Sequence, residues 1–238
     1  MSIQLYNNDC FNILNTLEDK SVNLFILDLP YGQTANKWDS VIDLEQMWIE
    51  IKRILTDNGM VIFFCTTKFG YTIINSNPKW FKYDLIWEKC SAQGFLNCNN
   101  APLRKHEMIY VFSNPKNKVK EKTYNPQKTE GKPYKIIKKD NRCINYGNIK
   151  ASDIVNDGTR FPVSIIKFNF DKVKYHPTQK PLKLLEWLIK TYSNENDMVC
   201  DFTMGSGGCG VVCKDLKRSF VGIEKNKEYF DIAKKRMS

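Results

Sequence analysis

The segment Asp28-Leu-Pro-Tyr31-Gly32 contains residue types that could do chemistry on an amino group. It follows an apolar run, residues 22–27, that predicts a buried strand, and open α/β sheets bind ligands at the carboxyl ends of their strands. The Asp28 carboxylate and the Leu29 carbonyl could accept the two N–H bonds of an exocyclic amine on a nucleobase and stabilise charge that develops on its nitrogen. Tyr31 offers a face against which an extruded base could stack. An ordinary turn after a strand has the same composition, so this segment alone leaves both interpretations open.

A second candidate segment is the glycine-rich run Asp201-Phe-Thr-Met-Gly-Ser-Gly-Gly-Cys-Gly210, which follows one predicted strand and opens a helix. Its glycines fit the GxGxxG pattern of nucleotide-binding turns, and Glu224 ends the next strand, where an acid can bind ribose hydroxyls. A packing turn between a strand and a helix would use the same glycines. Only fourteen residues follow Glu224, so N-terminal strands must complete the sheet and the ligand-binding unit comes last.

The elements that would position these segments alternate between apolar runs and segments of helical period, which predicts an α/β fold with a mostly parallel sheet. The predicted strands number seven and cover residues 3–6, 22–27, 60–65, 83–87, 108–112, 198–202 and 220–224. Helices are predicted at 10–17, 44–55, after Lys68, at 182–192, at 208–216 and from Lys227.

Residues 113–165 interrupt this pattern, because they are rich in Lys, Asn, Pro and Gly and poor in aliphatic side chains. We therefore predict a catalytic domain formed by 1–112 and 166–238 with an irregular insert at 113–165; a disordered linker is the alternative. Between 116 and 150 there are eleven Lys and Arg against three acidic residues, in a chain of net charge +10. With interspersed tyrosines, such a segment suits contacts to DNA phosphates. Candidates for reading bases are too many to choose among: Asn125, Gln127, Asn141, Arg142 and Asn145.

The composition of the 238 residues indicates one principal domain. No apolar stretch is long enough to span a membrane and the N-terminal residues do not resemble a secretory signal, so we expect no membrane association and a cytoplasmic location. The eight cysteines include no CxxC pair, so we expect reduced thiols and no bound metal.

The ordered set of motifs resembles the β group of amino-methyltransferases from bacterial restriction-modification systems and phages. In that family the catalytic tetrapeptide comes first, the target-recognition region lies in the middle and the cofactor motif comes last. The matching segments cover nearly everything outside the insert: Asn8–Cys10, Asp28–Tyr31, Arg104–Ser113, His176–Pro181, Asp201–Gly207 and Phe220–Glu224. The resemblance implies a three-layer, Rossmann-like methyltransferase fold that is circularly permuted, with an inserted DNA-recognition region.

The resemblance also implies a site that binds S-adenosylmethionine and releases S-adenosylhomocysteine. Its catalytic residues would be Asp28, Leu29, Pro30 and Tyr31. Its cofactor-binding residues would be Asp9, Cys10, Asp28, Thr178, Lys180, Asp201, Phe202, Gly205, Ser206, Gly207 and Glu224.

Among these residues, Asp9 and Cys10 would line the adenine end of the cofactor and Glu224 would hold its ribose. Thr178 and Lys180 would lie near the methionine carboxylate, while Phe202 and the loop 205–207 would pass under the methionine part. Simpler roles remain open, because Asp9 could cap a helix and the prolines of 177–181 could frame a turn. Double-stranded DNA is the expected partner in a bacterial or phage-infected cell, and a homodimer and a cognate restriction endonuclease are further partners that the resemblance allows.

Three departures from the family pattern concern the site: Leu29 replaces the usual first proline, Thr203 precedes Met204 where Phe is more common, and Gly208 replaces a hydroxyl residue. Asp28 favours adenine N6 as the acceptor, since cytosine-N4 relatives usually have Ser there; cytosine N4 is the alternative. Glutamine methyltransferases of translation factors carry Asn in the tetrapeptide and place it after the cofactor motif, which argues against them. A degenerate homologue that binds DNA without turnover stays open.

Overall fold

The computed structural model describes residues 1–30, 42–116, 122–137, 141–143, 147–149 and 153–238, with only the backbone considered at 141–143 and 147–149. It divides into a larger unit, Met1–Asn125 with Ser164–Ser238, and a smaller unit, Pro126–Val163. The N–H groups of Thr123 and Asn125 donate to the carbonyls of Asn58 and Thr191. These bonds tie residues just before Pro126 to the larger unit.

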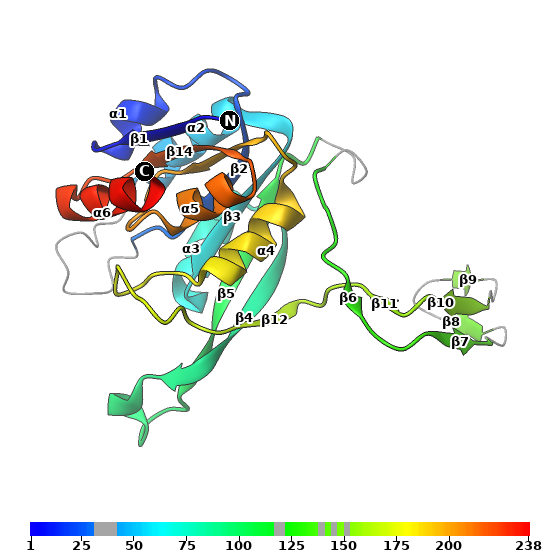
Figure 1. Cartoon of the computed structure of the whole chain (residues 1–238). Helices are drawn as coiled ribbons and strands as arrows, with labels where there is room; N and C mark the ends of the chain where they lie inside the picture. The colour runs from blue at the N-terminus through cyan, green and yellow to red at the C-terminus, as the bar shows by residue number, and fades with distance from the viewer. Residues whose placement is uncertain (31–41, 117–121, 138–140, 144–146, 150–152) are drawn as a thin grey trace. The chain divides into compact units, whose positions relative to one another are not determined.

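A mostly parallel sheet forms the centre of the larger unit (Figure 1), as the sequence predicted. In spatial order its strands are β1 (Ile3–Tyr6), β14 (Ser219–Ile223), β13 (Met198–Asp201), β2 (Val22–Leu27), β3 (Leu55–Cys65), β5 (Arg104–Ser113), β4 (Phe81–Gln93) and β12 (Ile165–Phe168). Among the strand pairs of this sheet in the described residues, β3–β5 and β5–β4 are antiparallel and the others are parallel. The glycine-rich segment thus lies between the last two strands of the sequence, and N-terminal strands complete the sheet.

The predicted count of seven strands was wrong, because the described residues alone form a sheet of eight. The additional strand is β12, which pairs with β4 in parallel at the sheet edge. Its four residues overlap the end of the predicted insert and bury only Ile166, so they carry too short an apolar pattern to be recognised from the sequence.

Helices cover both faces of the sheet and create three layers (Figure 1). They are α1 (Cys10–Leu14), α2 (Leu44–Ile54), α3 (Thr67–Ser76), α4 (Leu182–Tyr192), α5 (Gly208–Asp215) and α6 (Lys227–Met237). The buried strand β2 shows the division: Leu24 and Ile26 face the core shared with α4, α5 and α6, and Phe25 and Leu27 face the core shared with α1, α2 and α3. None of the helices in the described residues is long and apolar enough to cross a membrane.

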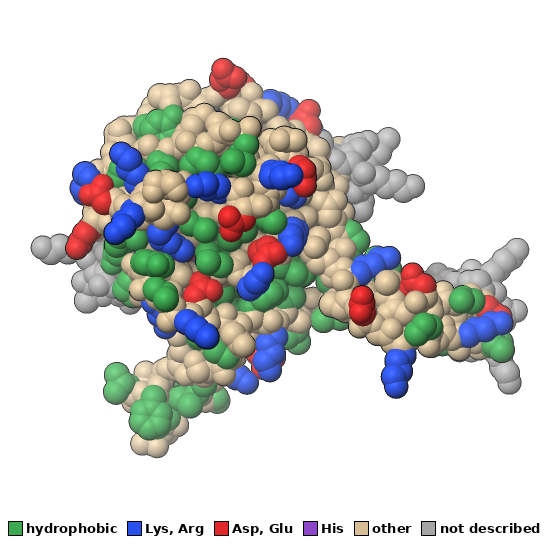
Figure 2. Space-filling view, in the orientation of Figure 1, with side chains coloured by type: hydrophobic (Ala, Val, Ile, Leu, Met, Phe, Trp, Pro, Cys, Tyr) green, Lys and Arg blue, Asp and Glu red, His purple; other side chains and the backbone are tan. Residues whose placement is uncertain are grey.

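Strands β4 and β5 form a long antiparallel hairpin whose connection contains a short 3₁₀ helix, η1 (Phe95–Asn97). Figure 2 shows hydrophobic side chains gathered at the free end of this hairpin, where Phe95 and Leu96 are exposed. The described part of the smaller unit contains three two-stranded antiparallel ladders, made by β6 (Thr129–Glu130), β7 (Tyr134–Ile136), β8 (Asn141–Cys143), β9 (Gly147–Ile149), β10 (Ile154–Asn156) and β11 (Thr159–Arg160). Strands of two or three residues carry no readable period, which is why the sequence predicted an irregular insert.

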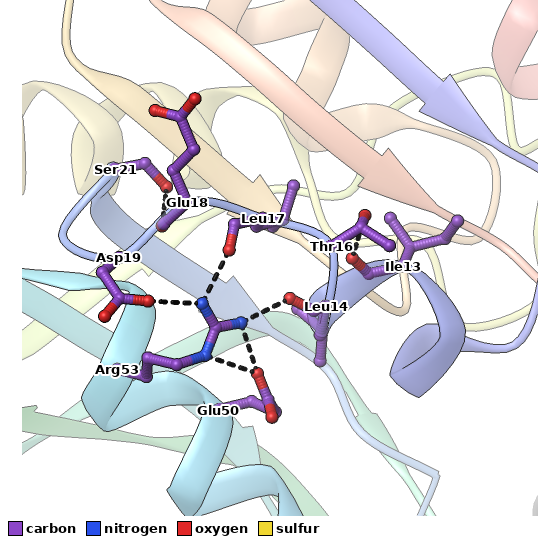
Figure 3. Close-up of polar contacts among 9 residues, drawn as sticks. All are labelled: Ile13, Leu14, Thr16, Leu17, Glu18, Asp19, Ser21, Glu50 and Arg53. Atoms are coloured by element: carbon purple, nitrogen blue, oxygen red, sulfur yellow. Dashed lines mark hydrogen bonds and ion pairs between the residues drawn. The ribbon is translucent and has the colours of Figure 1, made fainter.

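Arg53 joins α1 to α2 and so fixes the helix whose start carries Asp9 and Cys10 (Figure 3). Its guanidinium donates to the carbonyls of Leu14 at 2.9 Å and Leu17 at 2.7 Å, and it forms ion pairs with Asp19 and Glu50. Carbonyls at the end of a helix have no partner within the helix, and Arg53 supplies one from outside.

We predict that Arg53→Met lowers the free energy of unfolding by about 1 to 3 kcal/mol, because the Leu14 and Leu17 carbonyls each lose a hydrogen bond and Asp19 and Glu50 lose their ion pairs. Urea titration would measure the loss. Lys227→Met, which removes an exposed ion pair with Asp231 on α6, is the matched control and should change stability far less. An equal effect of both substitutions would contradict this role of Arg53.

Candidate active site

The two candidate segments meet at one edge of the sheet because β2 and β13 are adjacent parallel strands. Asp28 follows β2 and Asp201 ends β13, and both line one cavity of about 870 Å³. Pockets of this volume accommodate ligands of nucleotide size. The described residues that the sequence predicted for the site and that line this cavity are Asp9, Cys10, Asp28, Leu29, Pro30, Thr178, Lys180, Asp201, Phe202, Gly205, Ser206 and Glu224.

Two of the predicted site residues are not among those lining residues. Gly207 lies in the glycine-rich turn but does not line the cavity, while its neighbour Gly208 does. Tyr31, the predicted stacking ring, lies outside the described residues.

The glycine-rich turn is built on backbone conformations and close approaches that a side chain would disturb. Gly205 has φ of +50° and Gly207 has φ of +76°. A Cβ on Gly207 would lie 2.7 Å from Met237 Cε and 2.8 Å from Ala233 Cβ, both on α6. Arg236 of the same helix donates to the Ser206 carbonyl at 2.6 Å, so α6 holds the turn from behind.

Glu224 is fixed at the edge of the cavity by backbone donors. Its Oε2 accepts the N–H of Gly205 at 2.9 Å and its Oε1 accepts the N–H of Asn226 at 2.7 Å. Burial raises the pKa of Glu224, and these N–H groups offset part of that effect. The Glu224 carboxylate, which follows β14, is thereby hydrogen-bonded to the glycine-rich turn that follows β13.

Asp9 accepts the N–H of Phe11 at 3.1 Å and therefore caps α1 while it lines the same cavity. Its Oδ2 lies 3.1 Å from Lys225 Nζ. Burial, reinforced by the charge of Asp9, raises the pKa of the Cys10 thiol to about 11. Cys10 therefore presents a neutral thiol to the cavity at physiological pH.

Lys180 holds a central place among the charged groups of the cavity. Its Nζ lies 2.7 Å from Asp28 Oδ2 and 2.8 Å from Glu107 Oε1. Glu107 Oε2 lies 2.8 Å from Lys89 Nζ. Burial by itself lowers the pKa of Lys180, but the two carboxylates outweigh it and raise that pKa above its usual value. The ammonium is therefore charged and is bonded directly to the predicted catalytic carboxylate.

Sequence reasoning assigned no role to several residues that line this cavity. They are supplied mainly by the β4–β5 hairpin and by the segment before α4, and they include Lys89, Gln93, Arg104, His106, Glu107, Lys174 and His176. Arg104 and Glu107 belong to a segment that matched the family pattern, but their convergence on Asp28 depends on the pairing of β5 with β3. Only the family pattern could have pointed to them, because charged residues on strands commonly face solvent.

Comparison with known proteins identifies the family. The family model for DNA methylases of the N6/N4 type matches residues 22–235. The chain belongs to this family. It is therefore a DNA methyltransferase, as the resemblance implied, and S-adenosylmethionine is its cofactor.

Known methyltransferases match nearly the whole chain. It is 29% identical to the type II methyltransferase M.HpaI of Haemophilus parainfluenzae, over all of this chain and 74% of that protein. It is 28% identical to M1.MboII of Moraxella bovis, over 97% of this chain and 94% of that protein. The solved M1.HpyAVI–SAM complex superposes with a TM-score of 0.68 at 28% identity, covering 98% of this chain and 99% of that one. The cytosine-N4-specific PvuII DNA methyltransferase shares the fold, with a TM-score of 0.71 at 14% identity over 100% and 87% of the two chains.

The residues present fit the cofactor. A nucleoside needs an acceptor for its ribose hydroxyls, and Glu224 is held at the cavity wall by two N–H groups. The methionine part needs a backbone that approaches closely, and Gly205 leaves such room, because a Cβ there would have its nearest neighbour, the His176 ring, at 3.9 Å. Among the described residues no group of three or more His, Cys, Asp and Glu side chains could hold a metal ion.

The Asp201 carboxyl should make the stability of the protein without cofactor fall as pH rises. Burial raises its pKa to about 8, so the folded state retains a proton that the unfolded chain releases near pH 4. Between these two values its contribution to the free energy of unfolding falls by up to roughly 1.4 kcal/mol per pH unit.

Asp201→Asn removes this titration. We predict that between pH 5 and pH 7 the variant gains on the order of 2 kcal/mol relative to the unsubstituted protein. Urea unfolding at several pH values would measure the difference, with the exposed Asp231→Asn as control. A difference that stays constant with pH would show that Asp201 ionises normally.

Proposed function

We propose that this methyltransferase transfers a methyl group from S-adenosylmethionine to N6 of an adenine extruded from double-stranded DNA at a specific sequence. The observation that carries the proposal is the position of Asp28, which lines the same cavity as the glycine-rich turn and Glu224. A carboxylate next to a cofactor cavity, at the end of a buried strand, can reach an amino group that is presented to the methyl donor.

The chain's own groups would act on the amino nitrogen as acceptors. When bound, the cofactor supplies a methyl group on a sulfonium centre. Asp28 and the Leu29 carbonyl would accept the two N–H bonds of the amine and stabilise the positive charge that grows on its nitrogen during attack. Pro30 fixes the direction of the chain after the carbonyl. Stacking of the base on Tyr31 stays a prediction.

The cofactor would lie along the cavity between Asp9 and the glycine-rich turn. Glu224 would accept from its ribose hydroxyls, with Asp9 and Cys10 at the adenine end. Phe202 and the turn of Gly205, Ser206 and Gly207 would lie under the methionine part, near Thr178 and Asp201. Lys180 was also predicted near the methionine carboxylate, but its bonds to Asp28 and Glu107 give it a second role at the acceptor side.

Asp28 also supports adenine over cytosine as the target. The family pattern places Ser at this position in most cytosine-N4 enzymes, and a hydroxyl is a weaker acceptor than a carboxylate. Cytosine N4 remains the second candidate, because its exocyclic amine offers the same two N–H bonds and a relative of this fold is cytosine-N4-specific.

The smaller unit, Pro126–Val163, would contact the DNA. Lys128 Nζ lies 4.5 Å from the centroid of the Phe161 ring and the Arg160 guanidinium lies 4.7 Å from that of Tyr134. Cations beside aromatic rings suit phosphate contacts combined with stacking. The division of labour between a catalytic domain and this recognition unit, the homodimer and the cognate restriction endonuclease all stay predictions.

Expression in a methylation-free bacterial host, followed by long-read sequencing of its DNA, tests the reaction and the base together. We expect N6-methyladenine at a recurrent sequence. N4-methylcytosine at such a sequence would support the second candidate, and unmodified DNA from a host with folded, cofactor-binding protein would support a degenerate homologue.

Asp28→Ala should lower the methylation rate by about 10² or more, a far larger factor than the change in affinity for S-adenosylmethionine, since the carboxylate acts mainly on charge that develops during attack. Single-turnover assays and calorimetry would separate the two effects. Asp231→Ala on α6 is the control. Full activity of Asp28→Ala would overturn the assigned chemistry.

A further inference from the structure

Four side chains of alternating charge follow one another along the wall of the cavity, and we refer to Asp28, Lys180, Glu107 and Lys89 as the charge chain. We propose that Glu107 and Lys89 are positioning residues that set how strongly Lys180 binds the Asp28 carboxylate, and thereby how well that carboxylate accepts the amine of the target base. The inference rests on the proposed function, and it assigns a role to Glu107 and Lys89, to which that function gives none.

The charge chain is continuous and has direct contacts at each step. The distances between charged atoms are 2.7 Å from Asp28 to Lys180, 2.8 Å from Lys180 to Glu107 and 2.8 Å from Glu107 to Lys89. Exposed side-chain fractions are 25% for Asp28, 11% for Lys180, 14% for Glu107 and 11% for Lys89. Charges this poorly solvated persist only when they are paired.

Lys180 bonds two carboxylates at once, so each takes part of its hydrogen-bonding capacity. Glu107 uses one oxygen on Lys180 and the other on Lys89. Burial by itself raises the pKa of Glu107, but Lys180 and Lys89 together lower it below its usual value. Glu107 is therefore anionic and competes with Asp28 for the same ammonium.

This competition has a chemical consequence at Asp28. An ammonium bound to Asp28 alone would withdraw electron density from the carboxylate and weaken it as an acceptor for the amine. Without the ammonium, Asp28 would lose a cation that favours its ionised form, so its carboxyl would take up a proton more readily. Sharing Lys180 with Glu107 gives an intermediate strength. Lys89 keeps Glu107 ionised and so maintains the competition.

Other titratable groups face the charge chain and would respond to changes in it. Asp28 and Glu107 raise the pKa of the Cys65 thiol beyond the effect of burial, and Asp28 also raises that of Asp201. Lys180 adds to the lowering of the His176 pKa by burial. The pH dependence of the methylation rate therefore reflects several groups, so the shift in its acidic pKa between variants is the quantity that tests the charge chain.

Substitutions of Glu107 and of Lys180 should shift the pH dependence of the single-turnover rate in opposite directions. Glu107→Gln removes a negative charge, leaves Lys180 wholly to Asp28, and should shift the acidic pKa of the profile downward while the rate at its plateau falls roughly tenfold. Lys180→Gln removes the cation and should shift the acidic pKa upward by roughly one unit. Lys89→Gln raises the pKa of Glu107 and so weakens its competition for Lys180, and it should shift the acidic pKa in the direction of Glu107→Gln by a smaller amount.

A double variant and a matched control separate this role from mere loss of structure. Glu107→Gln with Lys180→Gln removes both charges and should recover part of the rate lost in Lys180→Gln alone, since Asp28 no longer lies near an unbalanced carboxylate. Glu88→Gln is the control, because it makes the same Glu-to-Gln change on the neighbouring strand β4. The Glu88 carboxylate is more exposed, pairs with Lys105 and Lys167 and does not line the cavity. Glu88→Gln should keep the rate and its profile.

The outcomes distinguish this inference from the proposed function. Affinity for S-adenosylmethionine, measured by calorimetry, should change less than the rate in Glu107→Gln. Equal reductions of rate and thermal stability in all variants, with unshifted profiles, would overturn the positioning role while the unsubstituted enzyme still methylates adenine. Shifts of the same sign in Glu107→Gln and Lys180→Gln would also overturn it. An unsubstituted protein that modifies no base would instead overturn the proposed function.

Discussion

The parallel pairing of β2 with β13 is the contact from which the site follows. Cys200 lies opposite Phe25, and at the start of the pair Met198 donates its N–H to Asn23 Oδ1 at 2.9 Å across 175 residues of sequence. Parallel strands end at the same edge of a sheet, so this register places the predicted acceptor Asp28 beside the glycine-rich turn that follows Asp201. Without it the two segments would have no common cavity.

The helical layers turn that register into a fixed geometry. On one face α6 packs behind the glycine-rich turn, where Gly207 and Gly210 leave room for Met237. On the other face α1 presents Asp9 to the cavity, and Arg53 ties the end of α1 to α2. Packing on opposite sides of the sheet thus fixes two parts of the cavity wall, and close-packed protein interiors move little.

Charge balance is the second constraint on the cavity. Lys180 is charged at a place where burial opposes charge, and it remains so because Asp28 and Glu107 bond it directly. No cation is among the main influences on the Asp201 carboxyl. Burial therefore raises its pKa to about 8, and the carboxyl keeps its proton at neutral pH. Asp28 and Asp201 therefore lie in different electrostatic environments, although both stand at the ends of neighbouring parallel strands.

The sequence by itself determined the α/β fold class, because apolar runs and turn residues are local patterns. The order of its motifs carried the family resemblance, which named part of the cavity lining. Tertiary structure alone decided the eighth strand, since the four residues of β12 carry too short a pattern of their own and form a strand by pairing with β4. It also decided the convergence of Lys89 and Glu107 on Lys180, because antiparallel register between β4 and β5 brings these residues together. A charged residue on a strand has no local signal for burial, so its partners emerge only when the sheet forms.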